Sequence, residues 1–269
     1  MKLKVLVDNN TYIDEYFVGE PAASYYIECD NKRILFDTGY SDAVITNAIK
    51  MGIDLNLLDY IVISHGHDDH TRGLKFINEK YNISDFKLIS HPACFDPKFF
   101  EGNSIGSPYS LEEINKITDY IPCENTFNIT ENLIFLGEIP VVCDFEPRYS
   151  IGDKLINGKF TDDYLIEDSA VVYKNEDGIF IITGCSHCGI CNIIEYAKKV
   201  CNDDRILGVI GGFHLFETDE RLDKTIEYFE DNNIENLYPC HCVSLKAKAK
   251  MLSSLNVTEV GVNMELNIK

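Results

Sequence analysis

The sequence predicts an α/β protein in which two mixed β-sheets face each other and helices cover both outer faces. Hydrophobic residues make up 45% of the 269 residues, which is enough to bury a full core in one domain. A segment near the N-terminus recurs in the second half of the chain, and each copy is followed by the same order of predicted elements. We therefore expect a single domain over residues 1–269, with related halves at about 1–91 and 169–269 and an insert at about 92–168.

Each half opens with a predicted β-hairpin. Residues 24–39 read SYYIECDNKRILFDTG, and residues 169–184 read SAVVYKNEDGIFIITG. Both copies place a polar turn between two apolar runs, and both end in Thr-Gly. The shared pattern indicates that the two halves follow one structural plan.

The hairpins are followed by helix, strand, helix and strand in the same order. In the first half we expect helices over 41–51 and 74–81 and strands that end at His65 and His91. In the second half we expect helices over 190–200 and 219–229 and strands that lead to His214 and His241. Two sheets paired face to face bring these strand ends to one edge, where ligands usually bind.

The insert and the C-terminal end carry weaker signals. Ser110 to Glu113 forms a capping box that predicts a helix reaching about Tyr120. The aromatic residues of the insert could form a lid or pocket wall, or could be ordinary core: Phe95, Phe99, Phe100, Tyr109 and Tyr149. A helix over 245–255 and a strand over 258–264 are expected to complete the fold.

Composition narrows the classes of partner. A formal net charge of −20 and a pI near 4.6 argue against nucleic acid, because phosphate backbones bind clustered Lys and Arg. No membrane-spanning run and no leader are evident, and ten cysteines in such a chain favour free thiols in a reducing compartment. We expect a cytoplasmic protein with a small-molecule substrate and no membrane partner; a homo-oligomer is compatible with the sequence.

Every one of the seven histidines lies at or just after the end of a predicted strand. Three of them, His65, His67 and His70, share one short turn with Asp69 after the apolar run 60–63. Imidazoles together with a carboxylate form the ligand set that Zn²⁺ or Fe²⁺ accepts. The sequence therefore predicts a metal site at this edge.

Several motifs resemble those of the metallo-β-lactamase superfamily over nearly the whole chain. They are Phe36-Asp37-Thr38-Gly39, the run at 64–71 that reads SHGHDDHT, His91-Pro92, the run at 183–190 that reads TGCSHCGI, the run at 211–215 that reads GGFHL, and His241-Cys242. Within the superfamily, they are most similar to the metal-dependent hydrolases grouped with dihydropterin ribofuranosyl-aminobenzene phosphate synthase. The resemblance implies an αββα four-layer sandwich.

The resemblance also implies two divalent metal ions, zinc first, with iron or manganese as alternatives. In the family pattern His65 and His67 hold one ion, and Asp69 and His70 hold the other. Asp37 orients a ligand and fixes its turn. A dimetal centre activates a hydroxide that both ions share, and either Asp69 or a residue of the lid is expected to help the leaving group depart.

The chain departs from the family pattern where most relatives have Thr-Gly-Asp. Here Cys185 takes the aspartate position, and either it bridges the ions or it packs beneath His187. The histidine usually found before this strand is absent from 163–169, which favours His187 as a ligand. His241 is expected to be the closing ligand, whereas His91 and His214 could bind metal or substrate.

These inferences predict a metal-dependent hydrolase acting on a small ester or phosphoester, with Arg72 and Arg148 as candidate substrate-binding residues. Two alternatives remain: a pterin-type transferase that displaces pyrophosphate, and a non-catalytic metal-binding or sensor protein on a hydrolase scaffold. An iron–sulfur cluster at Cys185, Cys188 and Cys191 is disfavoured, because the fourth cysteine of the ferredoxin spacing is missing.

Overall fold

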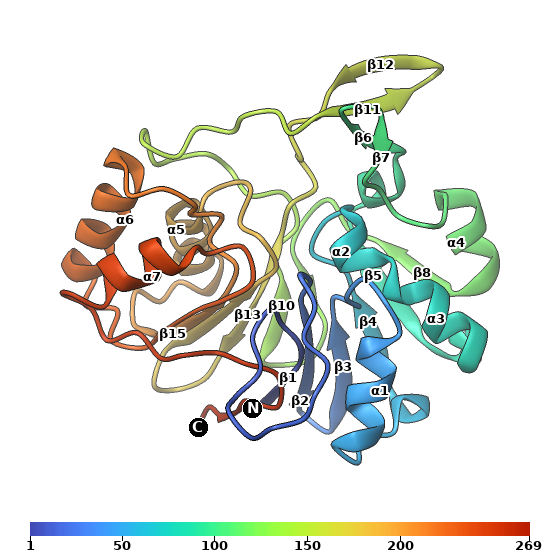
Figure 1. The fold of residues 1–269 in the computed structure, drawn as a ribbon, viewed down its shortest axis with the longest axis horizontal. Helices are drawn as coiled ribbons and strands as arrows, with labels where there is room; N and C mark the ends of the chain where they lie inside the picture. The colour runs from blue at the N-terminus through green and yellow to red at the C-terminus, as the bar shows by residue number, and fades with distance from the viewer.

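The computed structural model describes residues 1–269 and contains two large mixed sheets that face each other (Figure 1). The first sheet has seven strands, in the order β17 (Glu265–Asn267), β1 (Lys2–Val7), β2 (Ser24–Cys29), β3 (Lys32–Phe36), β4 (Tyr60–Val62), β5 (Lys87–Ser90) and β8 (Asp119–Pro122). The second has six, in the order β16 (Leu237–Pro239), β15 (Ile206–Gly211), β14 (Ile179–Thr183), β13 (Ala170–Lys174), β10 (Leu133–Phe135) and β9 (Phe127–Asn128).

Helices cover the outer face of each sheet. The first sheet is covered by α1 (Ala43–Lys50), α3 (Gly73–Lys80) and α4 (Leu111–Ile117). The second is covered by α5 (Ile190–Cys201), α6 (Glu220–Asp231) and α7 (Leu245–Met251). Short helical turns occur at η1 (Leu55–Leu57), α2 (Asp68–Thr71), η2 (Ile83–Asp85) and η3 (Pro92–Phe95). The predicted αββα four-layer sandwich is confirmed.

The alternation of side chains along each hairpin explains the layers. In β2, Tyr25 and Ile27 enter the core between the sheets, whereas Tyr26 enters the core under the helices of the first half. In β14, Phe180 and Ile182 enter the core between the sheets, and Ile179 and Ile181 face the helices of the second half. Because successive residues of a strand point to opposite faces, a strand buried on both sides reads as a continuous apolar run.

The two halves share their strand pairings as well as their order of elements. β2 pairs antiparallel with β3, which pairs parallel with β4, which pairs parallel with β5. β13 pairs antiparallel with β14, which pairs parallel with β15, which pairs parallel with β16. The parallel strands of each half therefore end at the same edge.

The insert is more structured than the sequence indicated. Its strands β8, β9 and β10 extend the two main sheets, and only part of it forms the separate small sheet that projects at the top of Figure 1. That sheet contains β12 (Lys159–Asp162), β11 (Asp153–Ile156), β6 (Lys98–Phe100) and β7 (Asn103–Ser104). The capping box at Ser110 is present, but α4 ends at Ile117 because Asp119 begins β8.

Two C-terminal expectations were wrong. The last helix ends at Met251 instead of residue 255, and residues 258–264 form no strand. Asn263 has a positive φ of 79°, which interrupts the extended backbone, and pairing with β1 resumes only at Glu265. No helix of the protein combines the length and apolarity that crossing a membrane requires.

Candidate metal centre

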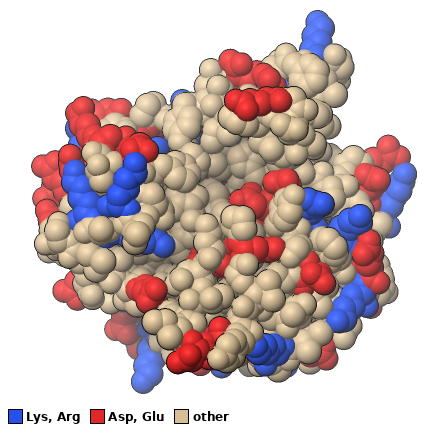
Figure 2. Space-filling view, in the orientation of Figure 1, with Lys and Arg blue, Asp and Glu red and all other residues tan.

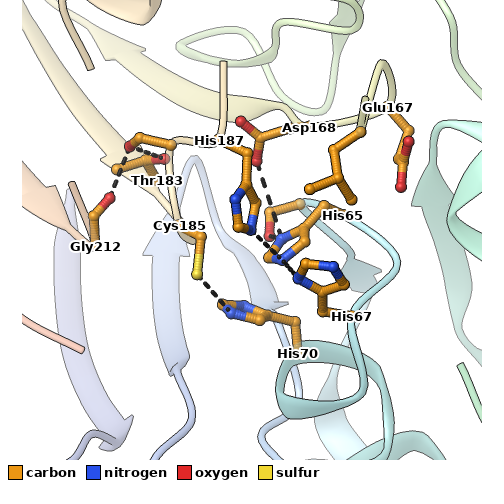
Figure 3. A network of polar contacts seen from close by, with 12 residues as sticks. His65, His67, His70, Glu167, Asp168, Thr183, Cys185, His187 and Gly212 are labelled. Carbon is orange, nitrogen blue, oxygen red and sulfur yellow. Dashed lines mark hydrogen bonds and ion pairs between the residues drawn. The ribbon is translucent and has the colours of Figure 1, made fainter. Parts of the chain in front are cut away.

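The strand ends of both halves bring the potential metal ligands together (Figure 3). His65 and His67 follow β4, and Asp69 and His70 lie in α2 directly after them. Across the gap between the sheets, Cys185 and His187 follow β14, and His241 follows β16. Except for Asp69, these side chains are buried.

The first group of donors consists of three imidazoles. His65 Nε2 lies 3.2 Å from His67 Nδ1 and 3.2 Å from His187 Nε2. Figure 3 shows the ring of His187 directed from its own half toward the His65 and His67 rings.

The second group adds a carboxylate and a thiol. His70 Nε2 lies 3.3 Å from His241 Nε2 and 3.2 Å from Cys185 Sγ. The Asp69 carboxylate lies 3.2 Å from His241 Nε2 and 3.6 Å from His70 Nε2.

The spacing of these atoms fits divalent ions better than hydrogen bonds. His67 Nδ1 and His187 Nε2 both face His65 Nε2. Each nitrogen of a neutral imidazole carries either one N–H or one lone pair, so these three nitrogens cannot all form hydrogen bonds with one another. A tetrahedral zinc ion with nitrogen ligands at about 2.0–2.1 Å places those ligands about 3.3 Å apart. Asp69 and Cys185 each belong to two of the possible metal sites, so the sites overlap. Overlapping sites of this kind suit a pair of neighbouring ions.

Asp37 orients His70 from behind. Its Oδ2 accepts a hydrogen bond from His70 Nδ1 at 2.7 Å and one from Ser64 Oγ at 2.7 Å, and Oδ1 accepts one from the Ser64 N–H at 2.7 Å. Because Asp37 holds the Nδ1 proton, Nε2 is the nitrogen of His70 that can lose its proton and bind metal at the centre. Gly184 permits this packing, because a Cβ there would lie 2.2 Å from Ser64 Oγ.

Burial and charge set the protonation of the histidines. Burial lowers the pKa of His65, His67 and His187, that of His67 to about 4, so these rings are neutral and ready to bind metal. At His70, the carboxylates of Asp69 and Asp37 outweigh burial and raise the pKa to about 9. Metal bound at His70 must therefore displace a proton at neutral pH.

Cys185 lies between the two groups but is not ionised in the free protein. Burial raises the pKa of its thiol well above the usual value. The neighbouring Cys242 donates to the Cys185 carbonyl oxygen at 3.5 Å. Against the effect of burial, Cys185 and His241 lower the pKa of Cys242 to about 7. Cys242 therefore ionises more readily, whereas Cys185 is the sulfur that lies 3.2 Å from His70 Nε2.

Cobalt spectroscopy should identify the sulfur ligand. If Cys185 binds metal, the Co²⁺-loaded protein will show an intense near-ultraviolet charge-transfer band, and Cys185→Ser will abolish it. Cys242→Ser is the matched control, because Cys242 lies beside Cys185. A band that survives the Cys185 change and disappears with Cys242→Ser would assign the thiolate to Cys242 instead.

The structure separates the remaining candidates. His91 Nε2 pairs with Glu138 at 3.1 Å and its Nδ1 accepts from the Ala93 N–H at 3.1 Å, so both nitrogens are engaged away from the centre. Arg148 donates hydrogen bonds to the carbonyl oxygens of Leu165 and Ile139 and so connects two main-chain segments. Its predicted role in substrate binding is therefore not supported. The ring of His214 lies against that of His187, with centroids 4.5 Å apart.

A cleft of about 420 Å³ opens beside the first group. Its lining residues are Pro21, Tyr40, His67, Asp68, Asp69, Phe100, Ile105 and Ile151. Figure 2 shows the surface hollowed below the projecting sheet. Arg72 borders the cleft, since its guanidinium stacks on Tyr40 at 4.3 Å. A larger hollow of about 630 Å³ beside the end of α5 is lined by polar residues and contains no histidine.

Sequence reasoning overlooked two residues that support the centre, Asp8 and Asn9, and considered Asp168 only as a substitute ligand. The Asp8 carboxylate accepts the His241 N–H at 2.9 Å, and Asn9 Oδ1 lies 3.2 Å from His241 Nδ1. Asp168 Oδ1 is buried 4.0 Å from His65 Nδ1. Asp8 and Asn9 directly follow β1, so the strand-end rule that identified the histidines could have identified them too, whereas Asp168 precedes the start of β13.

Comparisons with known proteins agree with the fold. The metallo-β-lactamase superfamily model matches residues 18–107. An uncharacterized protein of Methanocaldococcus jannaschii is 35% identical over 94% of each chain. The 7,8-dihydropterin-6-methyl-4-(β-D-ribofuranosyl)-aminobenzene-5'-phosphate synthase of the same organism is 28% identical over 92% of this chain and 89% of its own.

A solved structure agrees as well. A protein described as a metal-dependent hydrolase of the β-lactamase superfamily superposes with a TM-score of 0.85, at 27% identity, over 100% of this chain and 99% of its own. The match extends over both halves and the insert. The chain belongs to the metallo-β-lactamase superfamily.

Proposed function

We propose that the protein is a dimetal hydrolase that cleaves a small ester or phosphoester, with zinc as the resident metal. The observation that carries the proposal is that each donor group joins residues of both halves of the chain, with donor atoms 3.2–3.3 Å apart. In this proposal His65, His67 and His187 hold one ion, and Asp69, His70 and His241 hold the other. Cys185 lies between them. Ten free cysteines fit a cytoplasmic location.

Two divalent ions, when bound, polarise the reacting centre and lower the pKa of water to about 7. The protein holds the substrate and directs its protons. Asp69 is partly exposed at the floor of the cleft, and although burial opposes it, His70 lowers the pKa of its carboxyl group. A carboxyl group with such a low pKa stays ionised at neutral pH and is a weak base, so Asp69 serves as a ligand. The expected role of Asp69 in leaving-group departure is not supported, and the leaving group needs another donor.

The cleft beside His67 is suited to a small, partly apolar molecule. Tyr40 and Phe100 are exposed aromatic walls, and Phe95, by contrast, is buried in the core. Arg72 has no carboxylate partner and presents its charge at the edge of the cleft. An anionic ester with an apolar substituent would satisfy both features.

Metal analysis and a substrate panel test the proposal. Protein purified with and without oxygen should contain close to two transition-metal ions per chain. The zinc-loaded protein should hydrolyse members of a panel of phosphoesters and lactones, and His67→Ala should lose metal and kcat together. A folded protein without metal would refute the dimetal centre. A metal-loaded protein inert toward every ester would favour the sensor alternative.

A transferase is the second candidate, because the synthase relative matches 92% of the chain. In that case a pterin pyrophosphate would lose pyrophosphate to an aromatic ribosyl nucleophile in place of water. Including pterin pyrophosphates in the same panel, with and without the nucleophile, distinguishes the two. Turnover that requires the nucleophile would replace hydrolysis with transfer.

A further inference from the structure

His214 lies beside the metal centre without belonging to either donor group. Its ring is held between His187 and Phe216, at centroid distances of 4.5 and 4.7 Å. Its Nδ1 is 2.6 Å from the Tyr149 hydroxyl. Its Nε2 has no partner within the protein and is not enclosed, so that edge of the ring is open to a ligand.

Tyr149 and Arg221 determine which nitrogen of His214 carries the proton. The guanidinium of Arg221 lies over Tyr149, 6.0 Å from the ring centroid, and its charge acts on the Tyr149 hydroxyl. Arginine has donors only, so the hydroxyl oxygen faces Arg221 and the hydroxyl proton is directed to His214. His214 Nδ1 then accepts, and the N–H of the ring lies at Nε2.

The backbone and the repeat mark the same residue. His214 has a positive φ of 50°, a left-handed conformation that few non-glycine residues adopt. It is the third residue after β15, as His65 is the third residue after β4. An arginine stands seven positions later in both halves, Arg72 and Arg221. His214 is therefore the counterpart of His65, placed at the centre but outside the ligand set.

We infer that His214 is a catalytic residue that donates a hydrogen bond from Nε2 to a substrate oxygen beside the metal centre, with Tyr149 and Arg221 as positioning residues. The inference rests on the proposed hydrolase function. The substrate it selects has an oxygen that gains negative charge during the reaction, as in a phosphoester or carboxylic ester. A fixed donor of this kind contributes about 10²–10³-fold in kcat where it has been removed from other enzymes.

The tautomer of His214 can be measured without any substrate. In the zinc-loaded protein, ¹H–¹⁵N correlation of the histidine rings should show Nε2 protonated and Nδ1 bare at His214. Tyr149→Phe should produce a mixture of tautomers, whereas His91→Ala, at a strand end outside the cluster, should leave His214 unchanged. Inorganic phosphate should shift the Nε2 resonance of the wild type. A protonated Nδ1, or no response to phosphate, would overturn the inference even if the protein proves to be a hydrolase.

Kinetics with an ester from the panel provide the second test. His214→Ala should lower kcat by about 10²-fold with metal content intact, and His214→Gln, whose amide can place an N–H near the Nε2 position, should recover part of the loss. Loss of a metal ion in His214→Ala would make it a ligand instead. An unchanged kcat would make it a structural residue.

Discussion

Replacing His187 with alanine is expected to reduce metal content from two ions to one and to abolish turnover. His187 is the only residue of the second half in the first donor group, and its Nε2 lies 3.2 Å from His65 Nε2. Without it, His65 and His67 remain as a pair, which is too few ligands for a closed tetrahedral site. The affinity loss should exceed the roughly 10–100-fold that follows from removing a residue that only orients a ligand.

Metal titration of the purified variant by calorimetry and elemental analysis is the measurement. His91→Ala is the matched control, because His91 is also a buried strand-end histidine but bonds to Glu138. It should retain both ions and full kcat. If His187→Ala binds two ions with the affinity of the wild type, the first donor group has been assigned incorrectly, and Asp168 becomes the residue to test beside His65.

The candidate ligands were predictable because their signal is local. Three histidines and an aspartate within six residues after an apolar run predict a metal site from the sequence alone. His187 and His241 were predicted from the family resemblance, His187 because the histidine usual before this strand is absent and His241 as the closing ligand; the repeated order of elements places the strand ends of both halves at one edge. The tertiary pairing of Tyr149 with His214 was not predictable, since residues 65 positions apart meet only because the insert crosses the second half.

The main sheets were predictable for a similar reason, and the insert was not. Strands such as β2 and β14 are apolar on both faces, so their sequence signal is strong. Strands β11 and β12 are mostly exposed and depend on pairing with β6 from another part of the insert. The predicted substrate-binding role of Arg148 was wrong, because the sequence does not distinguish an arginine that is free to bind a substrate from one that donates to main-chain carbonyls.

Replacing Asp37 with asparagine is expected to remove the second ion selectively. Asp37 Oδ1 accepts the Ser64 N–H, so the amide oxygen of asparagine will take that place and the amide nitrogen will face His70 Nδ1. The amide then donates to His70, which moves the ring proton to Nε2 and blocks the lone pair that would bind metal. We expect the affinity of the second site to fall roughly 10–100-fold, while the first site keeps its ion.

Asparagine is the informative substitution because the fold tolerates it. Asp37 has a positive φ of 57°, which asparagine adopts readily, whereas alanine would be strained and would leave the buried Ser64 N–H unpaired at a cost of about 1–3 kcal/mol. Asp163→Asn serves as the control for lost stability, since it weakens the buried ion pair with Lys98 without touching His70. A two-step metal titration should show a weakened second step in Asp37→Asn and two normal steps in Asp163→Asn. Two normal steps in both variants would mean that His70 is oriented by its packing, and that the hydrogen bond to Asp37 does not determine its tautomer.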